Sequence, residues 1–140
     1  MEVDYAILAD SAEAVNGKLY LIGGSFDTLW AANFPVLHPK LSFAMRILFS
    51  PAEMDRQHAL EVNLIDADGK PLATVRGPLN LGVKNPDLPS GWKQGFLSVL
   101  NFANLAFPKS GHYSFEVVVN NTSLKSVPLR IAPKADIQTG

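Results

Sequence analysis

The chain has 140 residues, of which 47% are hydrophobic, and its 12 Lys and Arg nearly balance its 13 Asp and Glu. This length suits one domain, and the charges form no basic stripe, so binding to nucleic-acid phosphates is not expected. The chain contains no cysteine, which excludes a disulfide, a thiolate metal site and a catalytic thiol.

The first expected element is a β-hairpin that turns at Asn16-Gly17. Apolar residues lie on both sides of this pair, and both of its residues tolerate the positive φ angles of a type I′ turn. The preceding residues 10–14 contain Ala and Glu, which favour helix, so one helical turn is an alternative there. We favour a strand with a bulge.

The middle of the chain alternates apolar residues with others, which predicts half-buried strands. Phe26, Thr28 and Trp30 alternate first and are expected to lie on one side of a strand. Residues 50–56 are expected to form a polar connection, and the prolines and glycine of residues 84–94 predict the longest loop. Further strands are expected at 41–49, 60–64, 72–76, 79–83 and 96–102.

The clearest alternation lies in the C-terminal third of the chain. Tyr113, Phe115, Val117 and Val119 fall on alternate positions, with polar residues between the first three. A strand with one buried face has this pattern, so we expect these four side chains in the core. Pro128 lies within the last expected strand. Because proline lacks an N–H, this strand is either a sheet edge or limited to one partner near that point.

These elements amount to about eight or nine strands, with turn signals about every 8–12 residues, as in a sandwich or barrel. We therefore predict an all-β fold: an antiparallel β-sandwich, immunoglobulin-like or a related Greek key, of about eight strands. A single domain is expected over residues 1–132. Residues 133–140 contain few apolar anchors and are expected to form a frayed tail.

Catalytic motifs are absent from the sequence, which contains no nucleophile elbow, dinucleotide fingerprint or phosphate-binding loop. Its three histidines lack metal-ligand spacing. Asp66 and Asp68 could join Asp10 or Asp27 in a calcium site, but Asp-x-Asp-Gly is more typical of a hairpin turn. An enzyme would need two convergent carboxylates in a polar cleft, for example Asp27 and Asp66. We therefore expect no enzyme activity, no metal and no cofactor.

The two tryptophans are the candidate binding residues. Trp30 ends an alternating segment, and Trp92 lies in the long loop beside Gly91 and Lys93. An exposed tryptophan can anchor a sugar ring or a protein partner. The alternative for Trp92 is that it folds back as a lid over one end of the sandwich.

Several strand and turn motifs occur in a fixed order: Asp4-Tyr-Ala-Ile-Leu-Ala-Asp10, Gly17-Lys-Leu-Tyr-Leu-Ile-Gly-Gly24, Phe34-Pro35, His38-Pro39, Leu60-Glu-Val-Asn-Leu-Ile-Asp-Ala-Asp-Gly69 and Gly111-His-Tyr-Ser-Phe-Glu-Val117. Together they resemble a family of small bacterial proteins classified as a domain of unknown function. The resemblance covers nearly the whole chain and implies a compact, cytosolic β-sandwich. It brings no catalytic residue, cofactor or substrate.

We expect a protein-interaction or assembly module that uses an exposed sheet edge or a loop cluster. Apolar residues on both faces of two strands, Ala44 with Leu48 and Leu97 with Val99, suggest a homo-oligomer. The alternative is a β-sandwich that binds a carbohydrate or another small molecule through its tryptophans. No leader or apolar span is recognisable, so a cytoplasmic protein without membrane attachment is expected.

Overall fold

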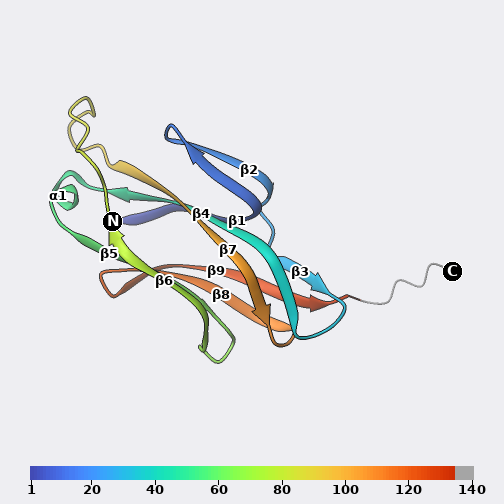
Figure 1. Ribbon diagram of the computed structural model, residues 1–140. Helices are drawn as coiled ribbons and strands as arrows, with labels where there is room; N and C mark the ends of the chain where they lie inside the picture. The colour runs from blue at the N-terminus through green and yellow to red at the C-terminus, as the bar shows by residue number, and fades with distance from the viewer. Residues whose placement is uncertain (135–140) are drawn as a thin grey trace.

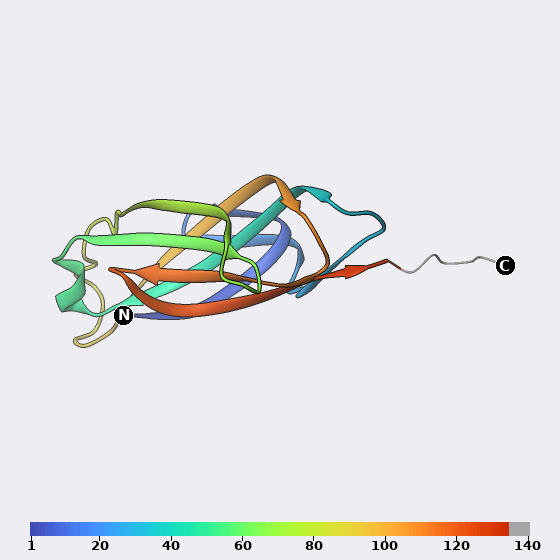
Figure 2. The ribbon, with the colours of Figure 1, turned by 90° about the horizontal axis from the view of Figure 1, so that it is seen from below.

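The computed structural model describes residues 1–134, and most of them belong to β-strands (Figure 1). Within these residues, nine strands form two sheets that pack face to face. Figure 2 shows strands of one sheet running obliquely across those of the other. Neighbouring strands are antiparallel, except that β3 (Thr28–Ala31) runs parallel to β9 (Thr122–Pro133). The predicted class, an antiparallel β-sandwich, is confirmed.

The first sheet contains, in spatial order, β2 (Lys18–Gly24), β1 (Glu2–Val15), β4 (Val36–Phe49) and β7 (Gln94–Phe107). The hairpin of β1 and β2 turns at Asn16 and Gly17, whose φ angles of 51° and 72° confirm the predicted turn. Residues 10–14 belong to β1, so the strand interpretation is correct there and the helical turn is not.

The second sheet contains, in spatial order, β3, β9, β8 (Gly111–Val119), β5 (His58–Ile65) and β6 (Pro71–Leu79). Pro128 of β9 pairs with Ser114 of β8, whereas β3 joins β9 only from Arg130 onward. The strand therefore has one partner at the proline, which is the second of the two predicted arrangements. It is not an edge strand, because β3 lies on its other side.

The side chains predicted to be buried in β8 form the centre of the core. Tyr113, Phe115, Val117 and Val119 are all at most 4% exposed. Phe115 stacks on Phe43 of the opposite sheet, with the two ring centroids 5.1 Å apart. An aromatic pair of this kind stabilises the fold beyond the burial of its area, and here it joins the two sheets.

The segment around β3 differs from the prediction. Phe26 packs against the core, whereas Trp30 is 63% exposed, so the two side chains do not lie on one side of a strand. The reason is that β3 begins only at Thr28, after Ser25 has taken a φ of 68°. The alternation from residue 26 therefore spans a bend as well as a strand.

Two connections also differ from the prediction. β6 ends at Leu79 and residues 80–93 form a loop, in which the apolar Val83 is 88% exposed. The polar connection after β4 contains one helical turn, α1 (Pro51–Met54). Ser50 begins this turn with a reciprocal capping box, since its side chain accepts from Glu53 N–H while its own N–H donates to Glu53.

The last described residues continue the second sheet. β9 runs to Pro133, and the N–H of Lys134 donates to the carbonyl oxygen of Ala31 at 2.7 Å. A frayed tail is predicted from residue 133, and its residues 135–140 lie outside the described part of the chain.

Candidate functional site

Exposed apolar side chains gather in the hairpin of β1 and β2. Half of the large hydrophobic side chains that are exposed in residues 1–134 belong to it, namely Val15, Tyr20, Leu21 and Ile22. Tyr20 is 55% and Ile22 73% exposed. β2 is the outermost strand of its sheet (Figure 1), so one side of its backbone has no neighbouring strand. An apolar edge strand of this kind is a surface to which another strand can add.

The two faces of the hairpin have different surroundings. Tyr20 and Ile22 lie opposite Glu13 and Ser11 of β1, on the face turned to solvent. Leu19 belongs to the other face. It packs in a small apolar cluster, separate from the main core, that also contains Ala9 and Ala12 of β1, Ala44 of β4 and Val99 of β7. The hairpin therefore rests on the sandwich with one face and presents the other.

Ala44 does not offer the surface that the predicted self-association would use, and the self-association itself stays a prediction. Its side chain is fully buried under the hairpin, and Leu48, Leu97 and Val99 are all partly buried. The alternation of β4 correctly places Ala44 on the outer face of the sheet, but the chain itself covers that face. The exposed apolar surface lies one step further out, on β2.

The other sheet edges expose less apolar surface than β2. β6 contains two prolines and the exposed Arg76, and β3 has only four residues. β7 has neither a proline nor a charge in its 14 residues, but none of its large hydrophobic side chains is exposed. Residues 19–22 of β2 also include neither a proline nor a charge, and three of their side chains are exposed and hydrophobic. β2 is thus the edge of the described chain with the most exposed apolar surface.

Two opposite charges lie at the two ends of β2. Lys18 is its first residue, and near its last residues the side chain of Asp10 lies across Gly23. Gly23 has a φ of 62° and no room for a Cβ, because the Asp10 carboxylate occupies that space. Within residues 1–134, neither Lys18 nor Asp10 belongs to an ion pair. By the register of the hairpin, however, Lys18 lies on the face of Tyr20, and Asp10 lies opposite Gly23 on the other face.

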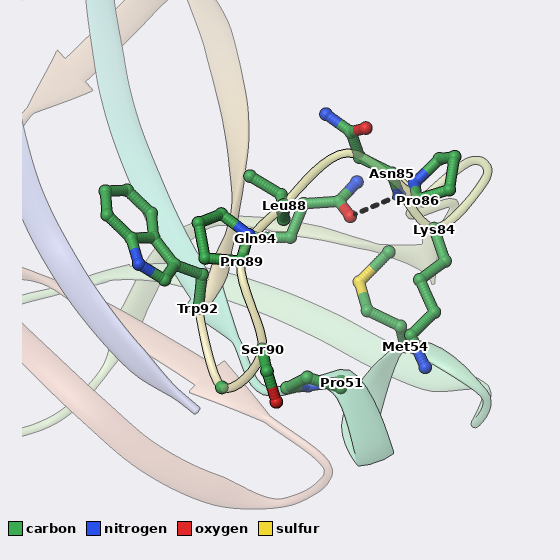
Figure 3. A pocket seen from close by; sticks show the side chains of 11 residues that line it. Pro51, Met54, Lys84, Asn85, Pro86, Leu88, Pro89, Ser90, Trp92 and Gln94 are labelled. Atoms are coloured by element: carbon green, nitrogen blue, oxygen red, sulfur yellow. Dashed lines mark hydrogen bonds between the residues drawn. The ribbon is translucent and has the colours of Figure 1, made fainter.

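A second candidate surface lies at the end of the sandwich that carries α1. The loop of residues 80–93 and α1 border a hollow of about 330 Å³. Figure 3 shows Met54, Leu88 and Lys84 around it, with the loop held by a hydrogen bond from Asn85 N–H to Gln94 Oε1 at 3.0 Å. This volume lies at the lower end of the range of small-molecule pockets.

Trp92 lies at the rim of this hollow and is 61% exposed. Figure 3 shows its ring on the side of the loop turned away from Met54. The residue also borders a second, more open depression, which it shares with Arg46 and Leu48 of β4. It therefore offers a flat apolar face to solvent without closing the hollow.

Trp30 lies far from Trp92, since β3 and the loop of residues 80–93 occupy opposite ends of the sandwich (Figure 1). The guanidinium of Arg130 lies 5.6 Å from the centre of the Trp30 ring, within the range of a cation–π contact. The two tryptophans named by the sequence thus belong to separate surfaces and do not form one site.

A polar cluster connects α1 to the second sheet. His58 is 6% exposed, and its Nε2 lies 2.7 Å from the carbonyl oxygen of Glu53. Its Nδ1 lies 2.8 Å from Nδ2 of Asn120, whose Oδ1 accepts from the N–H of Ala59. A neutral imidazole has one donor and one acceptor, so Asn120 donates to Nδ1 and Nε2–H donates to Glu53. Every polar atom of the pair is satisfied, which indicates a structural role.

The carboxylate of Glu53 is the acceptor of this region. Burial acts to raise its pKa, but hydrogen bonds from the Ser50 N–H and from the α-amino group of Met1, at 2.9 Å, outweigh burial. The pKa of Glu53 is thereby lowered from 4.5 to about 2. A carboxylate held in its charged form by fixed donors stabilises the turn in which it lies.

The acidic residues between β5 and β6 form the hairpin turn that their sequence predicts. Oδ1 of Asp66 accepts from the N–H groups of Asp68 and Lys70, each at 2.9 Å. Within residues 1–134, no three His, Asp or Glu side chains lie close enough together to hold a metal ion.

The residues of the β2 edge were not among the candidate site residues of the sequence. A signal for them exists in Leu19-Tyr-Leu-Ile22, where four apolar residues follow one another directly after a hairpin turn. A strand with one buried face would alternate, so an unbroken apolar run in a short outer hairpin indicates a second contact surface.

Fold and surface together define a small all-β sandwich whose edge strand β2 exposes apolar side chains. Residues 4–132 match a family of unknown function (DUF6941), and the chain belongs to this family. No characterised protein matches the sequence. No helix within residues 1–134 is long and apolar enough to cross a membrane.

Proposed function

We propose that the protein is an interaction or assembly module that binds a protein partner through the free edge of β2. The observation that carries this proposal is the pair of exposed side chains Tyr20 and Ile22, on an edge without proline or charge in residues 19–22. A strand added at this edge would satisfy the free backbone groups of β2.

The energetics favour such a contact. Burying an exposed apolar side chain stabilises a complex by about 1.5–3 kcal/mol, and Tyr20 and Ile22 lie next but one along the same face of β2. The other face already rests on the sandwich through Leu19, so the strand is held in an extended conformation before binding. Preorganisation of this kind lowers the entropic cost of association.

A photo-crosslinking residue tests the proposal directly. We expect Tyr20→p-benzoylphenylalanine to form a covalent product with a protein when the variant is irradiated in its native cells. The same substitution at Arg76, an exposed position on the edge strand β6, is the matched control and should give no product. Equal yields at the two positions, or no product at Tyr20, would contradict the proposal.

A second candidate function is the binding of a carbohydrate or another small molecule, supported by the hollow beside α1 and by the exposed ring of Trp92. A Trp30→Phe variant leaves Trp92 as the single tryptophan and makes its fluorescence specific. A shift of this fluorescence with one member of a glycan and metabolite panel, lost in Lys84→Ala, would support the candidate. An unchanged emission and melting temperature across the panel would rule it out in favour of the interaction module.

A further inference from the structure

We infer that His58 and Asn120 form an acid-sensitive latch, which joins α1 and the start of β5 to the β8–β9 turn while the imidazole is neutral and opens when the imidazole takes up a proton. This device goes beyond the proposed function and does not rest on it. The observation that carries it is a chain of hydrogen bonds that can run in one direction only.

The chain consists of three hydrogen bonds between fixed backbone groups. It begins at the N–H of Ala59, which donates to Asn120 Oδ1 at 2.9 Å, and it ends at the carbonyl oxygen of Glu53, 2.7 Å from His58 Nε2. A backbone N–H can only donate and a carbonyl oxygen can only accept, so both ends are fixed. The amide of Asn120 must therefore donate through Nδ2 to His58 Nδ1, 2.8 Å away.

This chain has no place for a second proton on His58. In an imidazolium both ring nitrogens carry a proton, so Nδ1–H would face the NH2 group of Asn120, donor against donor. Turning the amide over would bring its oxygen to Nδ1, but Nδ2 would then face the N–H of Ala59. Either arrangement loses a hydrogen bond, and His58 is only 6% exposed, so bulk water does not replace it.

The neighbours of His58 on the other strands offer no negative charge to an imidazolium. The Phe49 ring of β4 lies 5.5 Å from the imidazole between centroids, Leu79 of β6 pairs with His58, and Asn120 is neutral. Within residues 1–134, no ion pair includes His58. A proton on this ring therefore meets no compensating carboxylate.

The charged groups beside α1 do not change that balance. The one titratable side chain of α1 is that of Glu53, whose carboxylate accepts from the amino group of Met1 at 2.9 Å. Its pKa is about 2, so it stays charged over the range in which a histidine titrates. Asp55 and Arg56, which follow α1, are exposed to solvent. Only His58 itself can change its charge here near neutral pH.

Opening of the latch affects the end of the sandwich that carries the hollow. Proton uptake leaves the bond from His58 Nε2–H to Glu53 in place and breaks the contact with Asn120. The ring and α1 then lose their connection to the β8–β9 turn. Because Pro51 and Met54 of α1 border the hollow, the wall of the hollow formed by α1 responds to pH.

Asn120→Asp reverses the effect of the proton and so tests the latch. The introduced carboxylate has one oxygen for the N–H of Ala59 and one for an imidazolium Nδ1–H, and aspartate tolerates the φ of 51° at this position. Asn121→Asp is the matched control. It adds the same charge one residue further on, where the side chain is exposed and φ is 65°.

Urea unfolding of the three proteins at about pH 7.5 and about pH 5.5 measures the effect, since a histidine in the unfolded chain takes up its proton near pH 6.5. A fold that admits only the neutral ring binds fewer protons than the unfolded chain, so its stability falls as the pH falls. The folding equilibrium constant of the wild type and of Asn121→Asp should decrease several-fold, up to about tenfold, and that of Asn120→Asp should not. An equal decrease in wild type and Asn120→Asp would overturn the latch.

Nitrogen NMR of the histidine rings tests the latch without any substitution. At neutral pH the His58 ring should carry its proton on Nε2 and none on Nδ1. On acidification, the amide signals of residues 119–121 should shift together with proton uptake by His58, whereas titration of the exposed His112 should leave them unchanged. A neutral ring protonated on Nδ1, or proton uptake by His58 with unchanged signals at residues 119–121, would overturn the inference.

Discussion

The carboxylate of Asp10 occupies the space beside Gly23 in which any other residue would place its Cβ. This contact crosses from β1 to the edge strand β2 and ends the regular part of that strand, where Gly23 takes a φ of 62°. Glycine is required there for two separate reasons, its positive φ and its missing side chain.

Gly23→Ala should destabilise the protein more than Gly17→Ala. Both glycines have positive φ angles, of 62° and 72°, so both substitutions cost about 1–2 kcal/mol of backbone strain. A Cβ at Gly17 would meet nothing within 4 Å, whereas at Gly23 it must displace Asp10. Urea unfolding of the two variants measures the difference. Equal losses would show that Asp10 moves away without cost.

Removing the Asp10 side chain should relieve the second part of that loss. In an Asp10→Ala background, Gly23→Ala should cost less than in the wild type, because the carboxylate is gone and only the Cβ of residue 10, 3.1 Å from the added Cβ, remains close. A double-mutant cycle by urea unfolding gives this coupling energy. A coupling energy of zero would contradict the close approach of Asp10 to Gly23.

Phe115→Ala should lower the free energy of unfolding by about 3–5 kcal/mol, since it empties a fully buried site. The ring contacts both Phe43 and Phe102, so the loss spans the two sheets. Lys125→Ala on the adjacent strand β9 is exposed and should change the free energy by less than about 0.5 kcal/mol. Chemical denaturation of both variants would decide. A near-neutral Phe115→Ala would contradict its place in the core.

Asn120→Gly should cost about 1–3 kcal/mol, because it leaves His58 Nδ1 and the Ala59 N–H without their partners. Glycine retains the positive φ of 51° at this position, so the loss reports the amide group alone. The neighbouring Asn121, with a φ of 65° and an exposed side chain, provides the control. Thermal and urea unfolding should find Asn121→Gly close to the wild type. A neutral Asn120→Gly would show that water replaces the amide.

Glu53→Gln should make stability less dependent on acid. The pKa of Glu53 is about 2 in the folded chain, below its ordinary value of 4.5, so its carboxylate stabilises the fold above about pH 4.5. That stabilisation, about 1–3 kcal/mol, is lost as the pH falls from about 4.5 to about 2. The difference in unfolding free energy between wild type and Glu53→Gln should therefore be constant near neutral pH and shrink below pH 4.5. A difference that does not change with pH would contradict the charged contact.

Local patterns in the sequence predict most of the fold. Alternation in residues 113–119 correctly identifies the buried side chains, because period two is a direct consequence of strand geometry. Asn16-Gly17 correctly predicts its turn, because few residue pairs tolerate two positive φ angles. The missing N–H of Pro128 correctly limits β9 to one partner at that point. Each of these features depends on neighbours in the chain and not on distant contacts.

Features that depend on distant contacts could not be predicted in this way. The order of strands in each sheet places β9 between β3 and β8, which no local pattern specifies. Ala44 lies on the outer face of its sheet as alternation requires, yet the β1–β2 hairpin returns to cover it. The same return leaves Tyr20 and Ile22 exposed. The candidate site therefore became visible only with the tertiary structure.

Amide hydrogen exchange tests the central claim, that β2 is the edge to which a protein partner adds, most directly. If a partner strand adds there, the amides of residues 19–22 should exchange several-fold more slowly in an extract of the native cells than in buffer, while those of the edge strand β6 should exchange equally in both. Equal exchange of residues 19–22 under the two conditions would contradict the account.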